Sequence, residues 1–172
     1  MQLPTEPQTR EGRSPLSARV LLAGTPKVGK TSLLAEWAPK TTLIADTQSG
    51  TKLLPGEHYV EHVTSWAEFV SLVDALCVPG HRYKTVGIDL VDDLWNFCDK
   101  AHAGKNANLA TATDDYGRSG KSAEGAFRDT VGKLLASGLG VWFISHTREV
   151  EEDEIMRHKA KLDNKVLTYV QG

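Results

Sequence analysis

Short apolar runs alternate with helical patterns of apolar residues along most of the chain. Five runs, each of five or six residues, predict strands at residues 19–23, 42–46, 59–63, 85–89 and 141–146. Apolar residues three or four positions apart predict helices at residues 30–38 and 123–137, around residues 94–98, and after the capping box formed by Ser65 and Glu68. Strands and helices that alternate in this order predict an α/β fold, with a mainly parallel sheet and helices on both faces.

The segments outside this pattern predict loops and a leader. Residues 1–17 are polar and interrupted by proline, so we expect a disordered leader or a functional peptide arm, followed by one domain at residues 18–172. Residues 103–122 lack periodicity and predict a long loop, and residues 148–165 are densely charged with both signs. Residues 166–170 predict one further strand.

Composition excludes several classes of protein. The 172 residues include 20 lysines and arginines and 22 acidic residues, and the net charge of −2 excludes a globally basic nucleic-acid-binding protein but not a local basic patch. No run approaches the ~20 apolar residues that span a bilayer, and no signal-peptide segment is present, so we expect no membrane contact. The two cysteines, Cys77 and Cys98, have no metal-ligand spacing, which favours a reducing, cytoplasmic location.

The strongest motif in the sequence fits Gly-x-x-x-x-Gly-Lys-Thr and lies between a predicted strand and a predicted helix. Its glycines let backbone amides turn toward phosphate oxygens without interference from a Cβ atom. Lys30 would reach the β- and γ-phosphates, and the Thr31 hydroxyl would bind Mg²⁺. The motif therefore predicts an ATP site formed by Gly24, Thr25, Pro26, Lys27, Val28, Gly29, Lys30, Thr31 and Ser32.

An acidic residue at the end of another apolar strand completes the predicted metal site. Asp89 ends the run at residues 85–89, and such an aspartate holds Mg²⁺ through water in proteins with this phosphate loop. Asp89 also suits the N-cap of the following helix, and this interpretation stays open. Asp92 and Asp93 follow at the helix start, where they are interpreted as caps or solvated charges, with a role in the site as an alternative.

Four sequence blocks resemble the phage-type AAA/RecA-like ATP-binding proteins, which include short RecA-like recombinases that work with single-strand annealing. The blocks are GTPKVGKTSL, LIADTQSGTK, YKTVGIDLVDDLW and GLGVWFISHTRE, and they span roughly residues 19–150. The resemblance implies a RecA-like core that binds ATP and Mg²⁺ and hydrolyses ATP on single-stranded DNA. It also implies assembly into a ring or filament, a single-strand DNA-binding protein as partner, and a host-cell cytoplasmic location for a phage-encoded protein. Such a core usually carries more elements, which suggests C-terminal truncation of this chain.

Gln48 departs from the pattern of this family. The family ends the strand after the phosphate-loop helix in Asp-Thr-Glu, with the glutamate polarising the attacking water, whereas this chain has Asp46, Thr47 and Gln48. An amide cannot take a proton as a carboxylate does, although glutamine orients water in small GTPases. Asp46 and Asp89 are the alternative bases, and an ordinary loop role for Gln48 stays open.

The resemblance also assigns a sensor and two DNA-binding loops. His146, after Ser145, occupies the position that senses the γ-phosphate, with a purely structural role as the alternative. Residues 147–165 match the second DNA loop, although a solvated, mobile hairpin or loop explains their mixed charge equally well. Residues 103–122 match the first DNA loop, and the residues available there for phosphates and for base stacking are Lys105, Arg118, Lys121 and Tyr116.

Two other functions fit the same phosphate loop. A small-molecule kinase would need arginines in a lid over the phosphates, and residues 103–128 supply Arg118 and Arg128. A nucleotide-gated binding module with little turnover fits the amide at position 48. The leading hypothesis remains an ATPase, with Thr31 and Asp89 as metal ligands and the following catalytic residues: Lys30, Gln48, Asp89 and His146.

Overall fold

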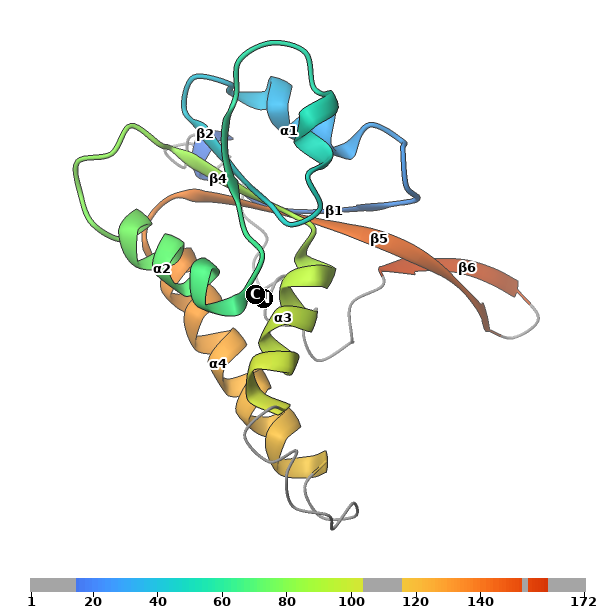
Figure 1. Ribbon diagram of the computed structural model, residues 1–172. Helices are drawn as coiled ribbons and strands as arrows, with labels where there is room; N and C mark the ends of the chain where they lie inside the picture. The colour runs from blue at the N-terminus through green and yellow to red at the C-terminus, as the bar shows by residue number, and fades with distance from the viewer. Residues whose placement is uncertain (1–14, 104–115, 153–154, 161–172) are drawn as a thin grey trace, which may run out of the picture.

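The computed structural model describes residues 15–103, 116–152 and 155–160 (Figure 1). Most of the first expected DNA loop and the strand expected at residues 166–170 lie outside these ranges, as does most of the expected leader. Residues 15–17 of that leader form a short 3₁₀ turn, η1 (Pro15–Ser17), in which the Leu16 carbonyl accepts a 2.9 Å hydrogen bond from the Thr85 hydroxyl. The folded part of the chain therefore reaches back at least to Pro15.

A parallel sheet with the strand order β1-β5-β4-β2-β3 forms the centre of the molecule (Figure 1). Its strands are β1 (Arg19–Gly24), β2 (Thr42–Asp46), β3 (Tyr59–His62), β4 (Thr85–Asp89) and β5 (Gly140–Glu152). Because β5 lies between β1 and β4, the register pairs Gly24 with His146, and it pairs Asp46 with Asp89 on the other side of β4. The expected functional residues at the strand ends thus share one edge of the sheet.

Helices cover both faces of the sheet (Figure 1), which confirms the predicted α/β class. Helix α1 (Lys30–Trp37) lies on one face. Its buried Leu34 belongs to the same hydrophobic core as Ile44 of β2 and Ile144 of β5. On the other face, a larger core gathers residues such as Phe69, Leu94 and Phe127 from α2 (Trp66–Leu76), α3 (Val91–Ala103) and α4 (Tyr116–Ala136). No helix in the described ranges is both long and apolar enough to cross a bilayer.

A close approach between α1 and β4 places the phosphate loop against the sheet. An ideal Cβ atom at Gly87 would lie 2.1 Å from Leu34 Cδ2, far inside van der Waals contact. Leu34 is fully buried, so its side chain occupies the space that any larger residue at position 87 would need. Glycine in the middle of β4 therefore sets how near the first helix comes to the strand that ends in Asp89.

One segment expected to be a loop, and one left open between a loop and a hairpin, are regular in the structure. Helix α4 begins at Tyr116, so residues 116–122 are helical despite the low helix propensity of their glycines and serines, as the first turns of a 21-residue helix. Strand β5 continues to Glu152 and pairs antiparallel with β6 (Ile155–Ala160), so residues 147–152 and 155–160 form the paired strands of the hairpin that the sequence left as an alternative. Figure 1 shows this β5–β6 hairpin extending beyond the sheet.

Candidate nucleotide-binding site

The phosphate loop connects the end of β1 to the start of α1. Gly29 has φ 91°, a left-handed conformation that glycine adopts without strain, and it forms the N-cap of α1. The buried side chain of Lys30 turns back into the loop, where its ammonium group donates 2.8 Å hydrogen bonds to the carbonyl oxygens of Gly24 and Thr25. Burial lowers the pKa of Lys30, and the nearby Asp89 and Asp92 carboxylates oppose that shift.

A cavity of about 260 Å³ opens beside this loop. All four residues expected to be catalytic line it, and each comes from a different part of the sheet edge: Lys30, Gln48, Asp89 and His146. The phosphate-loop residues that line it are Lys27, Gly29, Lys30, Thr31 and Ser32, whereas the remaining expected contacts, Gly24, Thr25, Pro26 and Val28, complete the loop without lining the cavity. Tertiary structure therefore brings the separate sequence motifs to one place.

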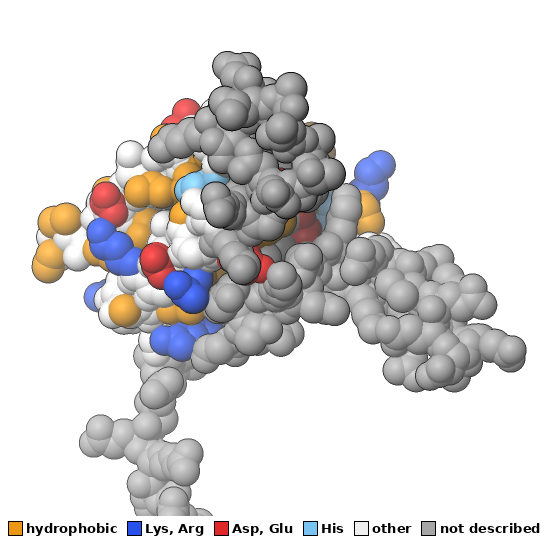
Figure 2. All heavy atoms as spheres, turned by 90° about the horizontal axis from the view of Figure 1, so that it is seen from below, with side chains coloured by type: hydrophobic (Ala, Val, Ile, Leu, Met, Phe, Trp, Pro, Cys, Tyr) orange, Lys and Arg blue, Asp and Glu red, His pale blue; other side chains and the backbone are white. Residues whose placement is uncertain are grey.

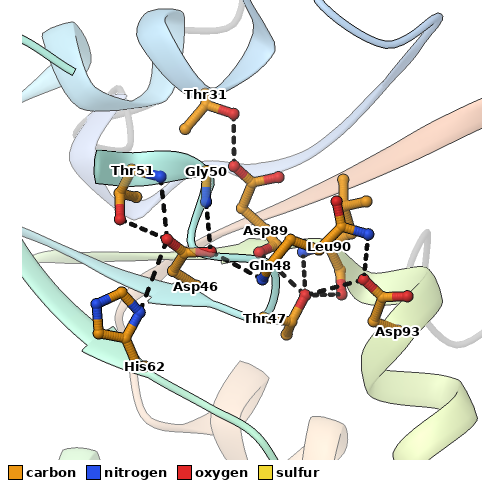
Figure 3. A network of polar contacts seen from close by, with 10 residues as sticks. All are labelled: Thr31, Asp46, Thr47, Gln48, Gly50, Thr51, His62, Asp89, Leu90 and Asp93. Carbon is orange, nitrogen blue, oxygen red and sulfur yellow. Dashed lines mark hydrogen bonds and ion pairs between the residues drawn. The ribbon is translucent and has the colours of Figure 1, made fainter. Parts of the chain in front are cut away.

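Thr31 and Asp89 form the direct contact between the two halves of the site (Figure 3). The Thr31 hydroxyl donates a 2.5 Å hydrogen bond to Asp89 Oδ2. Burial raises the pKa of Asp89, the nearby Asp46 adds to the rise, and the Thr31 hydroxyl, Lys30 and His146 oppose it. The result is a pair of adjacent oxygen atoms at the cavity wall, of the kind that Mg²⁺ prefers as ligands.

Asp46 organises the turn that follows β2. Its carboxylate accepts hydrogen bonds from the backbone amides of Gln48 (2.9 Å), Gly50 (3.3 Å) and Thr51 (3.0 Å), and from the Thr51 hydroxyl (Figure 3). Burial alone would raise the pKa of Asp46, but these hydrogen bonds outweigh it and lower that pKa. Both carboxylate oxygens are thus engaged in shaping the turn, which favours a structural role for Asp46 over that of an alternative base.

The turn places Gln48 beside the start of α3. Gln48 Nε2 donates a 2.6 Å hydrogen bond to Asp93 Oδ2. Thr47 Oγ1 lies 3.2 Å from the same oxygen and accepts a 2.8 Å hydrogen bond from the Leu90 amide. The turn after β2 is therefore joined to the first turn of α3 by side chains from both (Figure 3).

Asp92 holds the end of β5. Its carboxylate is almost fully buried, and it accepts a 2.9 Å hydrogen bond from the Ser145 hydroxyl and a 2.8 Å hydrogen bond from the His146 backbone amide. Interpreting Asp92 and Asp93 as caps or solvated charges was wrong, because both reach across to neighbouring strand ends. The available signal was their position, directly after Asp89 at the carboxyl edge of a parallel sheet, where ligand sites form in such folds.

Of the other residues expected to bind DNA from the first loop or to cover the phosphates, Arg128 is the one whose side chain the structure describes. Lys105 lies outside the described ranges, whereas Tyr116, Arg118 and Lys121 belong to the first turns of α4. Arg128 is exposed on α4 beside Asp129, 3.4 Å away, and is not among the residues that line the cavity. Arg128 therefore lends no support to an arginine lid of the kind that a kinase needs.

Comparison with known proteins agrees with this geometry. Residues 16–172 match the sequence model of a family described as an AAA domain. The chain belongs to this AAA-domain family. The crystal structure of the RadB recombinase is similar to this domain, with a TM-score of 0.51 and 13% sequence identity over 88% of this chain and 71% of that chain. The similarity confirms the expected RecA-like fold of this AAA-domain protein, and no curated protein matches the sequence.

Proposed function

We propose that this AAA-domain protein binds ATP together with Mg²⁺ and hydrolyses it. The observation that carries the proposal is the contact of Thr31 with Asp89 in a cavity that Lys30 also lines. A hydroxyl and a carboxylate oxygen fit a hard cation such as Mg²⁺, which completes its six ligands with phosphate oxygens and water. When bound, Mg²⁺ would neutralise charge that develops on the phosphates during cleavage.

Lys30 supplies the protein's own positive charge to the reaction. Its ammonium group is bound to two carbonyl oxygens of the loop, and those contacts exchange for phosphate oxygens when a nucleotide enters. The N-terminus of α1 adds backbone amides directed at the same phosphates. Gln48 orients the attacking water, and His146 contacts the γ-phosphate as the sensor, since both line the same cavity.

We further propose that the β5–β6 hairpin binds single-stranded DNA. The register pairs Arg148 with Lys159 and Val150 with Arg157, and alternate positions in paired strands belong to one face of a ribbon. By this alternation, one face carries three basic residues and one acidic residue, Arg148, Arg157, Lys159 and Glu152, whereas Glu149 and Glu151 belong to the other face. This distribution of charge supports a local basic surface within a segment of mixed composition. Such a surface is what the phosphate backbone of single-stranded DNA requires.

DNA binding would need a local basic surface because the chain as a whole carries no net positive charge. The net charge is −2, and Figure 2 shows basic and acidic side chains interspersed on the described part of the face that it presents. His146 and the first strand of the hairpin belong to one continuous strand, β5. A change at the γ-phosphate would therefore reach the DNA-binding segment through a single element.

The biological setting that we propose is DNA recombination with single-strand annealing in a phage, in the cytoplasm of the host cell. The four sequence blocks support it, and the similar RadB structure is described as a recombinase. In this setting the protein assembles into a ring or filament on single-stranded DNA and works with a single-strand DNA-binding protein.

A second candidate function is a nucleotide-gated binding module with little turnover. The observation in its favour is that an amide, Gln48, occupies the cavity position where the related ATPases carry a carboxylate. An amide orients water but does not accept its proton, so hydrolysis would be slow.

Phosphate release from ATP, measured with and without single-stranded DNA, tests these functions. The ATPase predicts release that DNA stimulates and that Lys30→Ala lowers by about a hundredfold or more, with Lys100→Ala, at an exposed position of α3, as the matched control. Tight ATP binding without release would instead support the module. Phosphoryl transfer to a small acceptor would support the kinase and overturn the ATPase.

A further inference from the structure

Gln48 is held at two points next to the cavity that it lines. Its backbone amide donates to Asp46 Oδ1 at 2.9 Å, and its side-chain Nε2 donates to Asp93 Oδ2 at 2.6 Å (Figure 3). The side chain is exposed to solvent, where a glutamine usually samples several rotamers. The short hydrogen bond to Asp93 therefore selects one orientation for a side chain that is otherwise unconstrained by packing.

The chemistry of Asp93 decides which way the amide faces. A carboxylate accepts hydrogen bonds and donates none, so only the NH₂ group of the amide can face it. In the described part of the chain, the hydrogen bonds of Gln48 involve its two nitrogen atoms and leave Oε1 as an open acceptor. Because Gln48 belongs to the cavity wall, its Oε1 is available to accept a hydrogen bond from a water molecule in the cavity.

The contacts of Asp93 differ from those of a helix cap. A capping carboxylate bonds to amides of its own helix, whereas Asp93 Oδ2 is bonded by the Gln48 side chain, 45 positions away in the sequence. The Thr47 hydroxyl lies 3.2 Å from the same oxygen, so two consecutive residues of the turn after β2 converge on it. Asp93 thus connects the first turn of α3 to the turn that carries Gln48.

We propose that Asp93 is the positioning residue that turns Gln48 Oε1 toward the attacking water, so that the Gln48–Asp93 pair takes the place of a catalytic glutamate. This inference rests on the proposed ATP hydrolysis. The water oxygen bonds to the γ-phosphorus while the bond to the β,γ-bridging oxygen breaks, and ADP leaves with that electron pair. One water proton remains on the inorganic phosphate and the other passes to solvent. Neither proton passes to the amide, whose role is to orient the water.

A double-mutant cycle on the full chain tests the pair. Asp93→Ala removes the acceptor and is expected to lower kcat on the order of tenfold, with ATP affinity changed by about twofold or less. Asp93→Asn keeps an acceptor oxygen for Nε2 and is expected to retain most of the turnover. Gln48→Ala is expected to lower kcat at least as much, and adding Asp93→Ala to it should cause little further loss. Asp99→Ala, which removes an exposed carboxylate from the same helix, is the matched control.

The measurements distinguish failure of the Gln48–Asp93 pair from failure of the proposed hydrolysis. If the wild-type chain releases phosphate and Asp93→Ala retains its kcat, the role of Asp93 is wrong and the proposed function stands. Additive losses in the double variant would also overturn the pairing, because the two residues would then act separately. If the wild-type chain releases no phosphate, the proposed hydrolysis and this inference both fail. Nucleotide affinity of each variant, measured by fluorescence titration, shows that the domain is folded.

Discussion

The Thr31 hydroxyl lies 2.5 Å from Asp89 Oδ2, although 58 positions separate the two residues in the sequence. Thr31 belongs to the first turn of α1, and Asp89 is the last residue of β4. Strand β5 lies between β1 and β4, so the contact also requires the correct order of three strands. This hydrogen bond therefore shows that the fold brings the phosphate loop and the acidic end of β4 together in a single site.

Removing the Thr31 hydroxyl should weaken nucleotide binding only when Mg²⁺ is present. Thr31→Ala removes one oxygen ligand and is expected to lower ATP affinity by about tenfold in Mg²⁺, with little change in EDTA. Thr31→Ser keeps the hydroxyl and serves as the control. Fluorescence titration with an ATP analogue measures both conditions, and equal losses with and without Mg²⁺ would contradict the assigned role.

Asp89→Asn should stabilise the fold at neutral pH while it impairs hydrolysis. The pKa of Asp89 is raised in the folded state, chiefly by burial, so the native state binds this proton more tightly than the unfolded chain does. Ionisation of Asp89 therefore costs stability as the pH rises above the unfolded pKa of about 3.9. Asparagine avoids this cost, and we expect a gain on the order of 1 kcal/mol in the free energy of unfolding at pH 7. Urea unfolding at pH 7 and pH 4 should show a smaller gain at the lower pH.

Substitution of Asp92 should loosen the end of β5. Asp92→Ala leaves the buried Ser145 hydroxyl and the His146 amide without their acceptor, which is expected to cost about 2–3 kcal/mol of stability. Ser145→Ala alone should cost about 1 kcal/mol, and the two losses should be less than additive because they remove a shared hydrogen bond. Chemical denaturation measures the cycle. Losses that add in full would show that the two residues are not energetically coupled.

A methyl group at Gly87 should displace α1. Gly87→Ala places Cβ in the space of the Leu34 side chain, and the overpacking is expected to cost about 1–3 kcal/mol and to weaken nucleotide binding. Gly132→Ala in α4 is the control, because a Cβ there meets no atom within 4 Å and should be neutral or stabilising by up to about 1 kcal/mol. In urea unfolding, the free energy of unfolding should therefore fall for Gly87→Ala and stay unchanged or rise for Gly132→Ala.

Gln48→Glu, which restores the acid of the related ATPases, should raise turnover little by itself. The new carboxylate would lie beside Asp93, where Nε2 now donates at 2.6 Å, and two like charges at that distance repel. The double variant Gln48→Glu with Asp93→Asn replaces the repulsion by a hydrogen bond and should exceed the wild-type kcat by about tenfold or more. Phosphate release from the wild type, the single variant and the double variant tests this expectation. A large gain from Gln48→Glu alone would contradict the expected repulsion between the carboxylates at positions 48 and 93.

Local sequence was enough to predict the elements that have a strong short-range signal. The phosphate loop at Gly24–Thr31, the capping box at Ser65 and the buried strands were all predicted, because each depends on neighbouring residues and on a fixed periodicity. Residues 116–122 were predicted as part of a loop, and the β5–β6 hairpin was one of two alternatives for its segment. The composition of both segments resembles that of loops, and their conformation depends on the rest of α4 in the first case and on strand pairing in the second.

The sequence by itself therefore determined the fold class and the residue types of a phosphate site, since backbone sterics and hydrophobic periodicity act over a few residues. Only the tertiary structure decided which acids belong to that site. Asp92 and Asp93 are neighbours in the chain, yet one is buried against the end of β5 and the other holds Gln48 after β2. The strand order sets these partners, and it is fixed by burial of the two faces of the sheet rather than by any local preference.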